Sequence, residues 1–274
     1  MVLKLGVFGD VVGQAGRAAV AKHLPGIKEA LRLDALILNI ENAASGFGFT
    51  RSMVAEFESL GVDAMITGNH AFDQKDSTDL FSQMPNLIRP ANYPEGTPGA
   101  GLCEIQTPKG TIVIIQVMAR LFMTPLDCPF RSVDRLLSAH RLGHSCKAIV
   151  VDIHGEATSE KMAMGHHLDG RVTLVEGTHT HVPTADTMIL PQGTAYQTDL
   201  GMIGDYHSVI GFDPQIPLTR FMTGRSGGRL KPALGEASVS GIYVEADLTT
   251  GLALRALPIR VGGNLPSTFP HPQS

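Results

Sequence analysis

Residues 35–42 read Ala-Leu-Ile-Leu-Asn-Ile-Glu-Asn, an apolar run that ends in two polar side chains. The centre of the run, Leu36-Ile37-Leu38, leaves no polar position on either face of a strand. Such strands are typical of sheets that helices cover on both faces, because neither face meets water. The same pattern returns in Ile149-Val150-Val151. The sequence therefore predicts an α/β protein whose sheets lie between helices.

Apolar runs alternate with helical patterns along the whole chain. Other runs of strand character cover residues 3–8, 64–67, 111–117, 172–176, 194–198 and 240–245. Stretches of helical character cover residues 17–23, 51–60, 75–83, 132–141 and 159–166. No long linker, charge run or internal repeat divides the chain, so we expect one domain over residues 1–264. The proline-rich end, residues 265–274, is expected to be flexible.

Composition narrows the class of protein. Of the 274 residues, 43% are hydrophobic and 18% are charged, which is typical of a compact protein with a sizeable core. A net charge of -4 offers no basic surplus for the backbone of duplex DNA. The three cysteines lack the spacing of a disulfide framework, which favours a reducing compartment. No apolar run approaches the length of a membrane span, so we expect a cytoplasmic protein without a membrane partner.

Short polar side chains follow five of the predicted strands. They are Asp10, then Glu41 and Asn42, then Asn69 and His70, then His154, and finally His179 and His181. In α/β sheets the carboxyl ends of the strands converge on one crevice, so we expect these residues to meet. His179 and His181 are two residues apart, which in an extended segment would place both side chains on the same side.

These side chains offer oxygen and nitrogen donors without a thiolate, a set that suits Mn, Fe, Zn or Ni. A pair of such ions acidifies a bridging hydroxide and aims it at phosphorus. Each residue alone has an ordinary structural explanation: Asp10 could cap a helix, Asn69 and His70 could form a turn, and His154 could be a core histidine. Their coincidence at five strand ends favours the metal centre.

Five motifs in a fixed order carry a family resemblance. Gly9-Asp10, Asn39-Ile40-Glu41-Asn42, Gly68-Asn69-His70, His154 and Gly177-Thr178-His179-Thr180-His181 together resemble the calcineurin-like metallophosphoesterase superfamily. Residues 9–13, 41–44, 89–92, 125–130 and 154–161 look like the YmdB-type bacterial phosphodiesterases. Two departures from the superfamily, Val12 in place of a His and Glu41 in place of an Asp, are shared by the YmdB-type group.

The resemblance implies a four-layer α/β/β/α sandwich of two mixed sheets flanked by helices. It implies a dinuclear centre of divalent or mixed-valence ions, Fe and/or Mn with Zn as an alternative, that hydrolyses phosphodiesters such as 2′,3′- or 3′,5′-cyclic nucleotides. Carried over by position, Asp10, Asn42 and His181 would hold the first ion, Glu41 would bridge, and Asn69, His154 and His179 would hold the second. His70 would stay free of metal and protonate the leaving oxygen after attack by the metal-bridging hydroxide.

Other functions and partners remain open at this stage. One alternative is a catalytically slow regulatory protein that senses a nucleotide, and another is a phosphomonoesterase or nucleotidase on the same centre. Arg89 and Asn92, in a proline-rich loop, are candidate substrate contacts. Expected partners are a small-molecule phosphodiester, short RNA and further copies of the chain, but not duplex DNA. Residues 224–228 match a nucleophile elbow by letters alone, and we predict a loop because no apolar strand leads into them.

Overall fold

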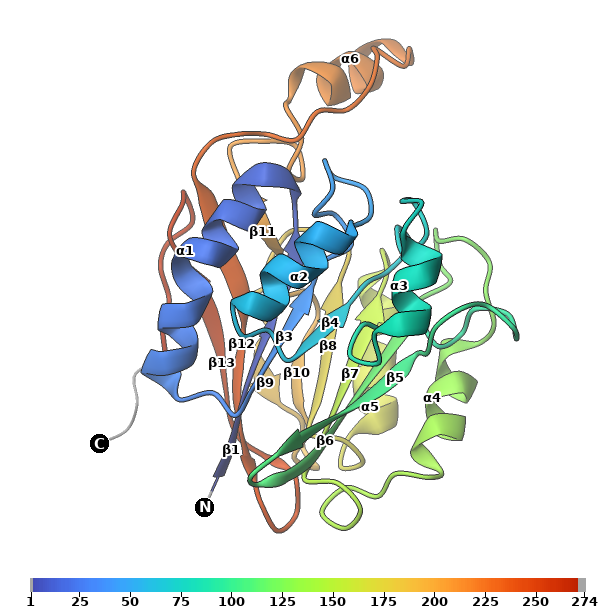
Figure 1. Cartoon of the computed structure of the whole chain (residues 1–274), viewed down its shortest axis with the longest axis vertical. Helices are drawn as coiled ribbons and strands as arrows, with labels where there is room; N and C mark the ends of the chain where they lie inside the picture. The colour runs from blue at the N-terminus through green and yellow to red at the C-terminus, as the bar shows by residue number, and fades with distance from the viewer. Residues whose placement is uncertain (1, 271–274) are drawn as a thin grey trace.

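Two mixed β-sheets lie face to face at the centre of the computed structural model, which describes residues 2–270, and helices flank them (Figure 1). The first sheet has the order β2-β11-β12-β1-β3-β4, with β13 paired to β12, and the second has the order β5-β6-β7-β8-β10-β9. The strands of the first sheet are β1 (Val2–Phe8), β2 (Asp10–Val11), β3 (Ala35–Asn39), β4 (Ala64–Ile66), β11 (Met202–Asp205), β12 (Ala237–Asp247) and β13 (Ala253–Val261). Those of the second are β5 (Leu102–Thr107), β6 (Gly110–Met118), β7 (Ala148–His154), β8 (Leu174–Thr178), β9 (Met188–Ile189) and β10 (Ala195–Gln197).

Helices cover the outer face of each sheet. The helices over the first sheet are α1 (Gly13–Leu31), α2 (Arg51–Ser59) and α3 (Ser77–Gln83), and those over the second are α4 (Pro129–Leu137) and α5 (Thr158–Leu168). A further helix, α6 (Gln215–Thr223), stands clear of both sheets at the top of Figure 1. The predicted four-layer α/β/β/α arrangement is therefore confirmed.

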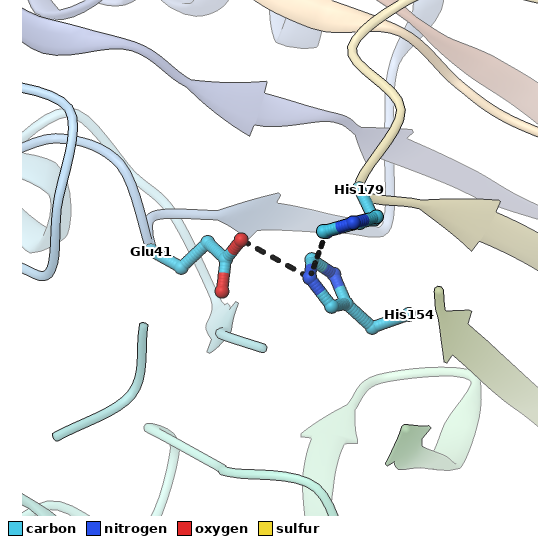
Figure 2. Close-up of side chains that lie close together, drawn as sticks. All are labelled: Glu41, His154 and His179. Carbon is cyan, nitrogen blue, oxygen red and sulfur yellow. Dashed lines mark hydrogen bonds and ion pairs between the residues drawn. The ribbon is translucent and has the colours of Figure 1, made fainter. Parts of the chain in front are cut away.

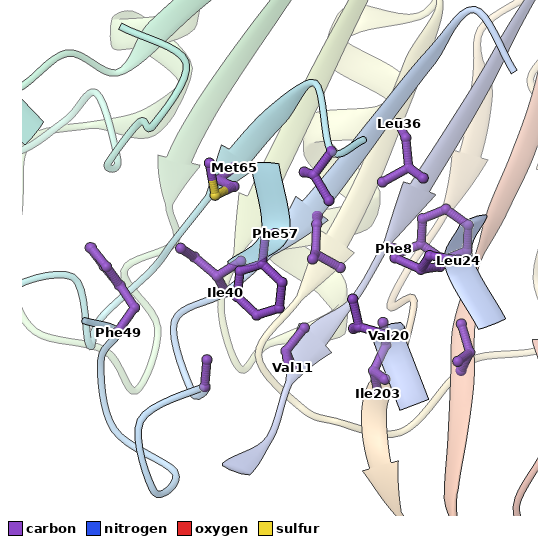
Figure 3. Close-up of a cluster of buried hydrophobic side chains, with 14 of the residues drawn as sticks. Phe8, Val11, Val20, Leu24, Leu36, Ile40, Phe49, Phe57, Met65 and Ile203 are labelled. Atoms are coloured by element: carbon purple, nitrogen blue, oxygen red, sulfur yellow. The ribbon is translucent and has the colours of Figure 1, made fainter. Parts of the chain in front are cut away.

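Side-chain alternation along the strands builds three hydrophobic layers. In β3, Leu36 and Leu38 belong to the cluster beneath the helices, whereas Ala35 and Ile37 belong to the cluster between the sheets. Successive side chains of a strand point to opposite faces, so a continuous apolar run fills two layers at once. Figure 3 shows Leu24 of α1 close to Phe8 and Leu36 in the outer cluster.

The prediction from the sequence did not include every element of this architecture. It predicted neither α6 nor the strands β2, β5, β9, β11 and β13, and it ended the first helix at residue 23, whereas α1 continues to Leu31 through Pro25. The flexibility predicted for residues 265–274 stays a prediction: residues 271–274 lie outside the described residues, and Thr268 exchanges two backbone hydrogen bonds with Arg260. Among residues 2–270, no helix is both long and apolar enough to cross a lipid bilayer.

The two sheets bring their strand ends to a common edge. Strands β1, β3 and β4 run parallel in the first sheet, and β6, β7, β8 and β10 run parallel in the second. The loop after β8 contacts β2 directly, because the backbone N–H of His179 donates to Asp10 Oδ2 at 3.1 Å. This contact joins the carboxyl edges of both sheets.

Candidate metal centre

Three potential ligands converge where the two sheets meet (Figure 2). Glu41 follows β3, His154 ends β7 and His179 follows β8. His154 Nε2 lies 3.1 Å from Glu41 Oε1 and 3.2 Å from His179 Nδ1. One ligand atom from each residue falls within 4.8 Å of the others. Such spacing suits donors that surround one cation.

The other predicted ligands lie around this trio. Asn69 Oδ1 is 2.8 Å from His154 Nε2, and Asp10 Oδ2 accepts the hydrogen bond from the His179 backbone. Asn42 and His181 line a cavity of about 300 Å³ together with Glu41 and His179. The structure thus brings all seven residues to one place, although they come from five separate segments of the chain.

The donor set fits a divalent cation. Within the described residues, Asp10 Oδ1 and Asn42 Oδ1 are buried without a hydrogen-bond partner. A buried polar atom left unpaired costs about 1–3 kcal/mol, a cost that a bound cation would remove. At Gly68 a side chain would collide with both Glu41 Oε2 and His154 Nε2. The backbone here therefore leaves room for a ligand that a Cβ would fill.

Hydrogen bonds on the far side of His154 set the direction of its ring. Thr178 Oγ1 lies 2.9 Å from His154 Nδ1 and donates to Asp152 Oδ1 at 2.8 Å. Gln116 Nε2 donates to Asp152 Oδ2 at 2.7 Å. Because the Thr178 hydrogen is used on Asp152, its oxygen accepts from Nδ1–H, and Nε2 faces the candidate centre. The sequence did hint at these hydrogen bonds, because Asp152 is a charged residue inside the apolar run of residues 148–154. This hint was not used in the sequence analysis.

The buried charges shift one another's pKa values. Burial raises the pKa of Glu41, but its attraction to His154 and its hydrogen bonds to His154 and His70 lower the pKa overall to about 2. Burial lowers the pKa of His154, while attraction to Glu41 and Asp10 raises it overall to about 9. Burial, followed by repulsion from His154, lowers the pKa of His179 to about 3. Without a cation, a proton on His154 thus neutralises Glu41.

His70 lies in the same cavity but outside the ligand group. It follows β4, and its backbone N–H donates to Glu41 Oε2 at 3.0 Å. Its Nδ1 lies 2.7 Å from Asp73 Oδ2, and its ring and that of Phe47 meet in a T-shaped arrangement with centroids 5.0 Å apart. A carboxylate only accepts hydrogen bonds, so Nδ1 donates to Asp73 and Nε2 is left for another partner.

The segment that carries His179 and His181 is a tight turn, which corrects the extended conformation considered from the sequence. Their φ angles are 99° and 66°, in the left-handed region of backbone conformation that residues other than glycine rarely adopt. Lys161 Nζ donates to Thr178 O and Asp199 Oδ2, both at 2.7 Å, and Asp199 Oδ2 also accepts from Thr180 N at 3.1 Å. A buried ion pair therefore holds the strained turn.

Comparison with known proteins identifies the family. The family model described as YmdB-like protein matches residues 7–259. The chain belongs to the YmdB-like family. The resemblance inferred from its motifs is confirmed.

Relatives with a named activity or a known crystal structure align over nearly all of this YmdB-like chain. The 2′,3′-cyclic-nucleotide 2′-phosphodiesterase of Bacillus subtilis is 41% identical over 248 residues, which are 90% of this chain and 93% of that protein. The crystal structure of a hypothetical protein from Thermus thermophilus has a TM-score of 0.88 at 42% identity, covering 96% of this chain and 100% of the other. A novel phosphatase from Mycoplasma pneumoniae has a TM-score of 0.90 at 31% identity, covering 96% and 94%.

The two predicted substrate contacts, Arg89 and Asn92, stay predictions, and the structure shows both side chains bound to backbone groups of this YmdB-like protein. The guanidinium of Arg89 is bound by four backbone carbonyls of its own loop, those of residues 90, 97, 98 and 99. The amide of Asn92 donates to Met118 O and Asp127 O and accepts from Met118 N. Neither residue lines the cavity, because these bonds use both side chains to order the loop.

Apolar side chains that the sequence did not single out complete the cavity. Phe47, Ile210, Phe212 and Leu230 line it beside the polar residues. The rings of Phe47 and Phe212 stack with centroids 5.4 Å apart. The cavity thus joins a charged floor to an apolar wall, an arrangement that fits a ligand with a charged group and a flat apolar part.

Proposed function

We propose that this YmdB-like protein is a two-metal phosphodiesterase that hydrolyses cyclic nucleotides, with 2′,3′-cyclic nucleotides as the first candidate and 3′,5′-cyclic nucleotides as the second. The observation that carries the proposal is the convergence of Glu41, His154 and His179 within 4.8 Å, beside a cavity with one apolar wall. An oxygen and nitrogen donor set of this kind suits Fe, Mn or Zn.

The proposed ligands divide between two cations. Asp10, Asn42 and His181 would hold one, Asn69, His154 and His179 would hold the other, and Glu41 would bridge them. Bound there, the two ions would polarise a phosphoryl oxygen and lower the pKa of an attacking water. The unpartnered oxygens of Asp10 and Asn42 support the first group, since a buried acceptor is stabilised by a cation.

The chain's own side chains would position the substrate and move the proton. The stacked rings of Phe47 and Phe212 offer an apolar surface for the nucleobase. His70 Nε2 would donate a proton to the departing ribose oxygen, with Asp73 holding Nδ1. The Thr178–Asp152 pair would keep the ring of His154 in one orientation.

The relatives support the reaction class. The enzyme class predicted from the sequence, a metal-dependent phosphodiesterase, is confirmed by relatives that are named as a phosphodiesterase and a phosphatase. The B. subtilis relative carries the name of the 2′,3′-cyclic substrate, at an identity of 41%. This similarity favours 2′,3′-cyclic over 3′,5′-cyclic nucleotides here.

Metal analysis combined with a substrate panel tests the proposal. The purified protein is analysed for bound metals, stripped with a chelator, and assayed with and without Mn²⁺ on 2′,3′-cyclic AMP, 3′,5′-cyclic AMP and adenosine monophosphates. We expect Mn-dependent formation of adenosine 3′-phosphate, and its loss in Glu41→Gln. Tight nucleotide binding without product would favour the sensing protein instead. Faster hydrolysis of the monophosphates would favour the nucleotidase.

A further inference from the structure

The segment of residues 214–235, here called the arm, projects from the body of the protein. It contains α6 and the loop that follows, and Figure 1 shows α6 well away from the two sheets. From Leu218 to Arg229 every residue except Thr219 is exposed. The arm contributes no residue to the three core clusters among the described residues. Burial of a core therefore does not account for its composition.

The arm is strongly basic within an acidic protein. It carries Arg220, Arg225, Arg229 and Lys231 without an acidic residue, whereas the whole chain has a net charge of -4. In the sequence, Asp213 and Glu236 directly flank the arm, and in the structure Asp205 Oδ2 accepts a hydrogen bond from Gly235 N at its far end. Arg220 closes the loop by donating to Ser226 O at 2.7 Å and Gly228 O at 3.0 Å.

The other three cations face solvent. Arg225, Arg229 and Lys231 are exposed, and among residues 2–270 none of them forms an ion pair. Unpaired cations on one short segment repel one another, and a polyanion relieves this repulsion. The charge pattern thus points to a ligand with several negative groups.

Exposed apolar side chains stand among these cations. Phe221 is 85% exposed and Met222 is 81% exposed. An aromatic face beside a row of cations is the combination that binds single-stranded nucleic acids, since bases stack on the ring while phosphates pair with the cations. A partner that buried only apolar surface would leave the charges unexplained.

The arm is continuous with the proposed catalytic cavity. Ile210, Phe212 and Leu230 line that cavity and also line a second hollow of about 200 Å³ beneath α6. Phe221 lines the second hollow from the arm side. A polymeric ligand with one end in the cavity could therefore extend over Leu230 toward Phe221.

We propose that the arm binds the upstream nucleotides of a single-stranded RNA whose 3′ terminus, a 2′,3′-cyclic phosphate, enters the cavity. This inference rests on the proposed function and names its polymeric substrate. The ligand is RNA because a 2′,3′-cyclic phosphate needs the ribose 2′-oxygen, which DNA lacks. In the reaction the oxygen of water bonds to phosphorus, the bond from phosphorus to O2′ breaks, and O2′ takes a proton. The RNA then ends in a 2′-hydroxyl and a 3′-phosphate.

Binding is tested apart from catalysis. A fluorescein-labelled single-stranded RNA decamer with an ordinary 3′-hydroxyl is titrated with the full-length, metal-stripped protein, and anisotropy is read at several salt concentrations. The triple variant Arg225→Gln/Arg229→Gln/Lys231→Gln should bind at least about tenfold more weakly. The slope of log K against log salt concentration should become shallower by roughly two. Phe221→Ala should weaken binding by roughly five- to 100-fold. The control variant Arg131→Gln/Arg135→Gln removes two exposed positive charges from α4 and should bind normally.

Kinetics with two substrates test the link to the site. The triple variant should lose at least about tenfold in kcat/KM on a decamer that ends in a 2′,3′-cyclic phosphate, and should keep its kcat/KM on 2′,3′-cyclic AMP. Equal kcat/KM of wild type and variant on the decamer, or no RNA binding by the wild type, would overturn the inference. So would a change of sedimentation mass in Phe221→Ala with RNA binding intact, since the arm would then join copies of the chain. If the wild type binds RNA but hydrolyses neither substrate, the proposed function fails and takes the substrate assignment with it, while arm binding stands.

Discussion

The Nε2 atom of His154 is placed where it could bind either a proton or a metal cation. It is fully buried, and its Nδ1 faces Thr178 while its Nε2 faces Glu41 and Asn69. Attraction to Glu41 is the main effect that raises the pKa of His154, to about 9, against the opposing effect of burial. A proton and a cation would therefore compete for Nε2, and metal affinity should fall as the pH falls.

The metal-free protein should lose stability as the pH rises from about 6.5 to about 9. The pKa of His154 is about 9 in the folded state against 6.5 unfolded, so its contribution is complete below 6.5 and disappears as the pH rises through 9. The loss should approach roughly 3 kcal/mol. Glu41 does not contribute in this window, because its lowered pKa makes stability fall only below about 4.5.

Urea unfolding of chelator-treated protein at pH 6, 7.5 and 9 measures this effect. The His154→Gln variant retains the other titrating groups but should lack this part of the pH dependence. An identical pH dependence in the variant and the wild type would mean that the proton is held elsewhere.

His70→Ala should separate proton donation from metal binding. For a diester with an alkoxide leaving group, turnover should fall by about 100- to 10,000-fold, because the departing oxygen needs a proton. An activated aryl diester should lose less, and the bound metal measured after purification should stay unchanged, since His70 contacts Glu41 only through its backbone N–H. Equal losses on both diesters would instead assign His70 to holding the phosphate.

At the scale of elements, helix α5 stabilises the turn that carries His179 and His181, which lies after β8. Lys161 lies on α5, is fully buried, and joins the end of β8 to Asp199 after β10. The turn between them holds His179 and His181 at positive φ. The pair thus links a helix and two strands to the geometry of two candidate ligands.

Lys161→Met should destabilise the protein by about 3–5 kcal/mol, because Asp199 would be left buried without its partner. Metal affinity should also fall, since the turn would relax. Urea unfolding and Mn²⁺ titration measure the two effects. The control is Lys22→Met, which breaks an exposed pair with Glu236 at 3.9 Å and should change stability by less than about 1 kcal/mol. A loss that small in Lys161→Met would contradict the role of the buried pair.

How much of the fold could be predicted depended on burial. Strands such as β3 and β7 are buried on both faces, so their sequences are continuously apolar and were predicted. Strands β5 and β13 each have a partly exposed face, and their mixed sequences gave no clear signal. The first helix extends past Pro25 because buried Ile27 and Leu31 continue its apolar stripe.

The candidate site followed the same logic. Residues at strand ends were predicted because α/β sheets concentrate chemistry there. Asp152 and Glu176 were not, because their positions acquire meaning only when the register pairs them across β7 and β8. Burial raises the pKa of Asp152 to about 6 and that of Glu176 well above its usual range. The sequence also did not reveal that loop carbonyls bind the guanidinium of Arg89, because these contacts depend on the fold of the loop.

At the scale of the whole molecule, the candidate centre joins the two sheets. Asp10, Glu41 and Asn69 come from the first sheet and its loops, whereas His154 and His179 come from the second. The apolar cluster between the sheets contains Ile37 from the first sheet and Val150 from the second. A cation bound there would therefore connect both halves of the sandwich, in addition to its chemical role.

Metal binding should consequently stabilise the entire fold. At a free Mn²⁺ concentration 100 times Kd, a ligand that binds only the folded state adds about 2.7 kcal/mol, which raises Tm by several degrees in a domain of this size. Thermal unfolding of the stripped protein across a Mn²⁺ series measures the shift. Glu41→Ala removes the proposed bridging ligand, which lies on the first sheet, and should abolish the shift. His154→Ala removes a ligand of one ion from the second sheet and should reduce the shift. Ile37→Val weakens the core between the sheets by about 0.5–1.5 kcal/mol without touching a ligand, so its Tm should start lower and rise by the same amount as in the wild type. If His154→Ala kept the full shift, the ions would be held without this ligand of the second sheet, and the proposed connection between the sheets through His154 would be wrong.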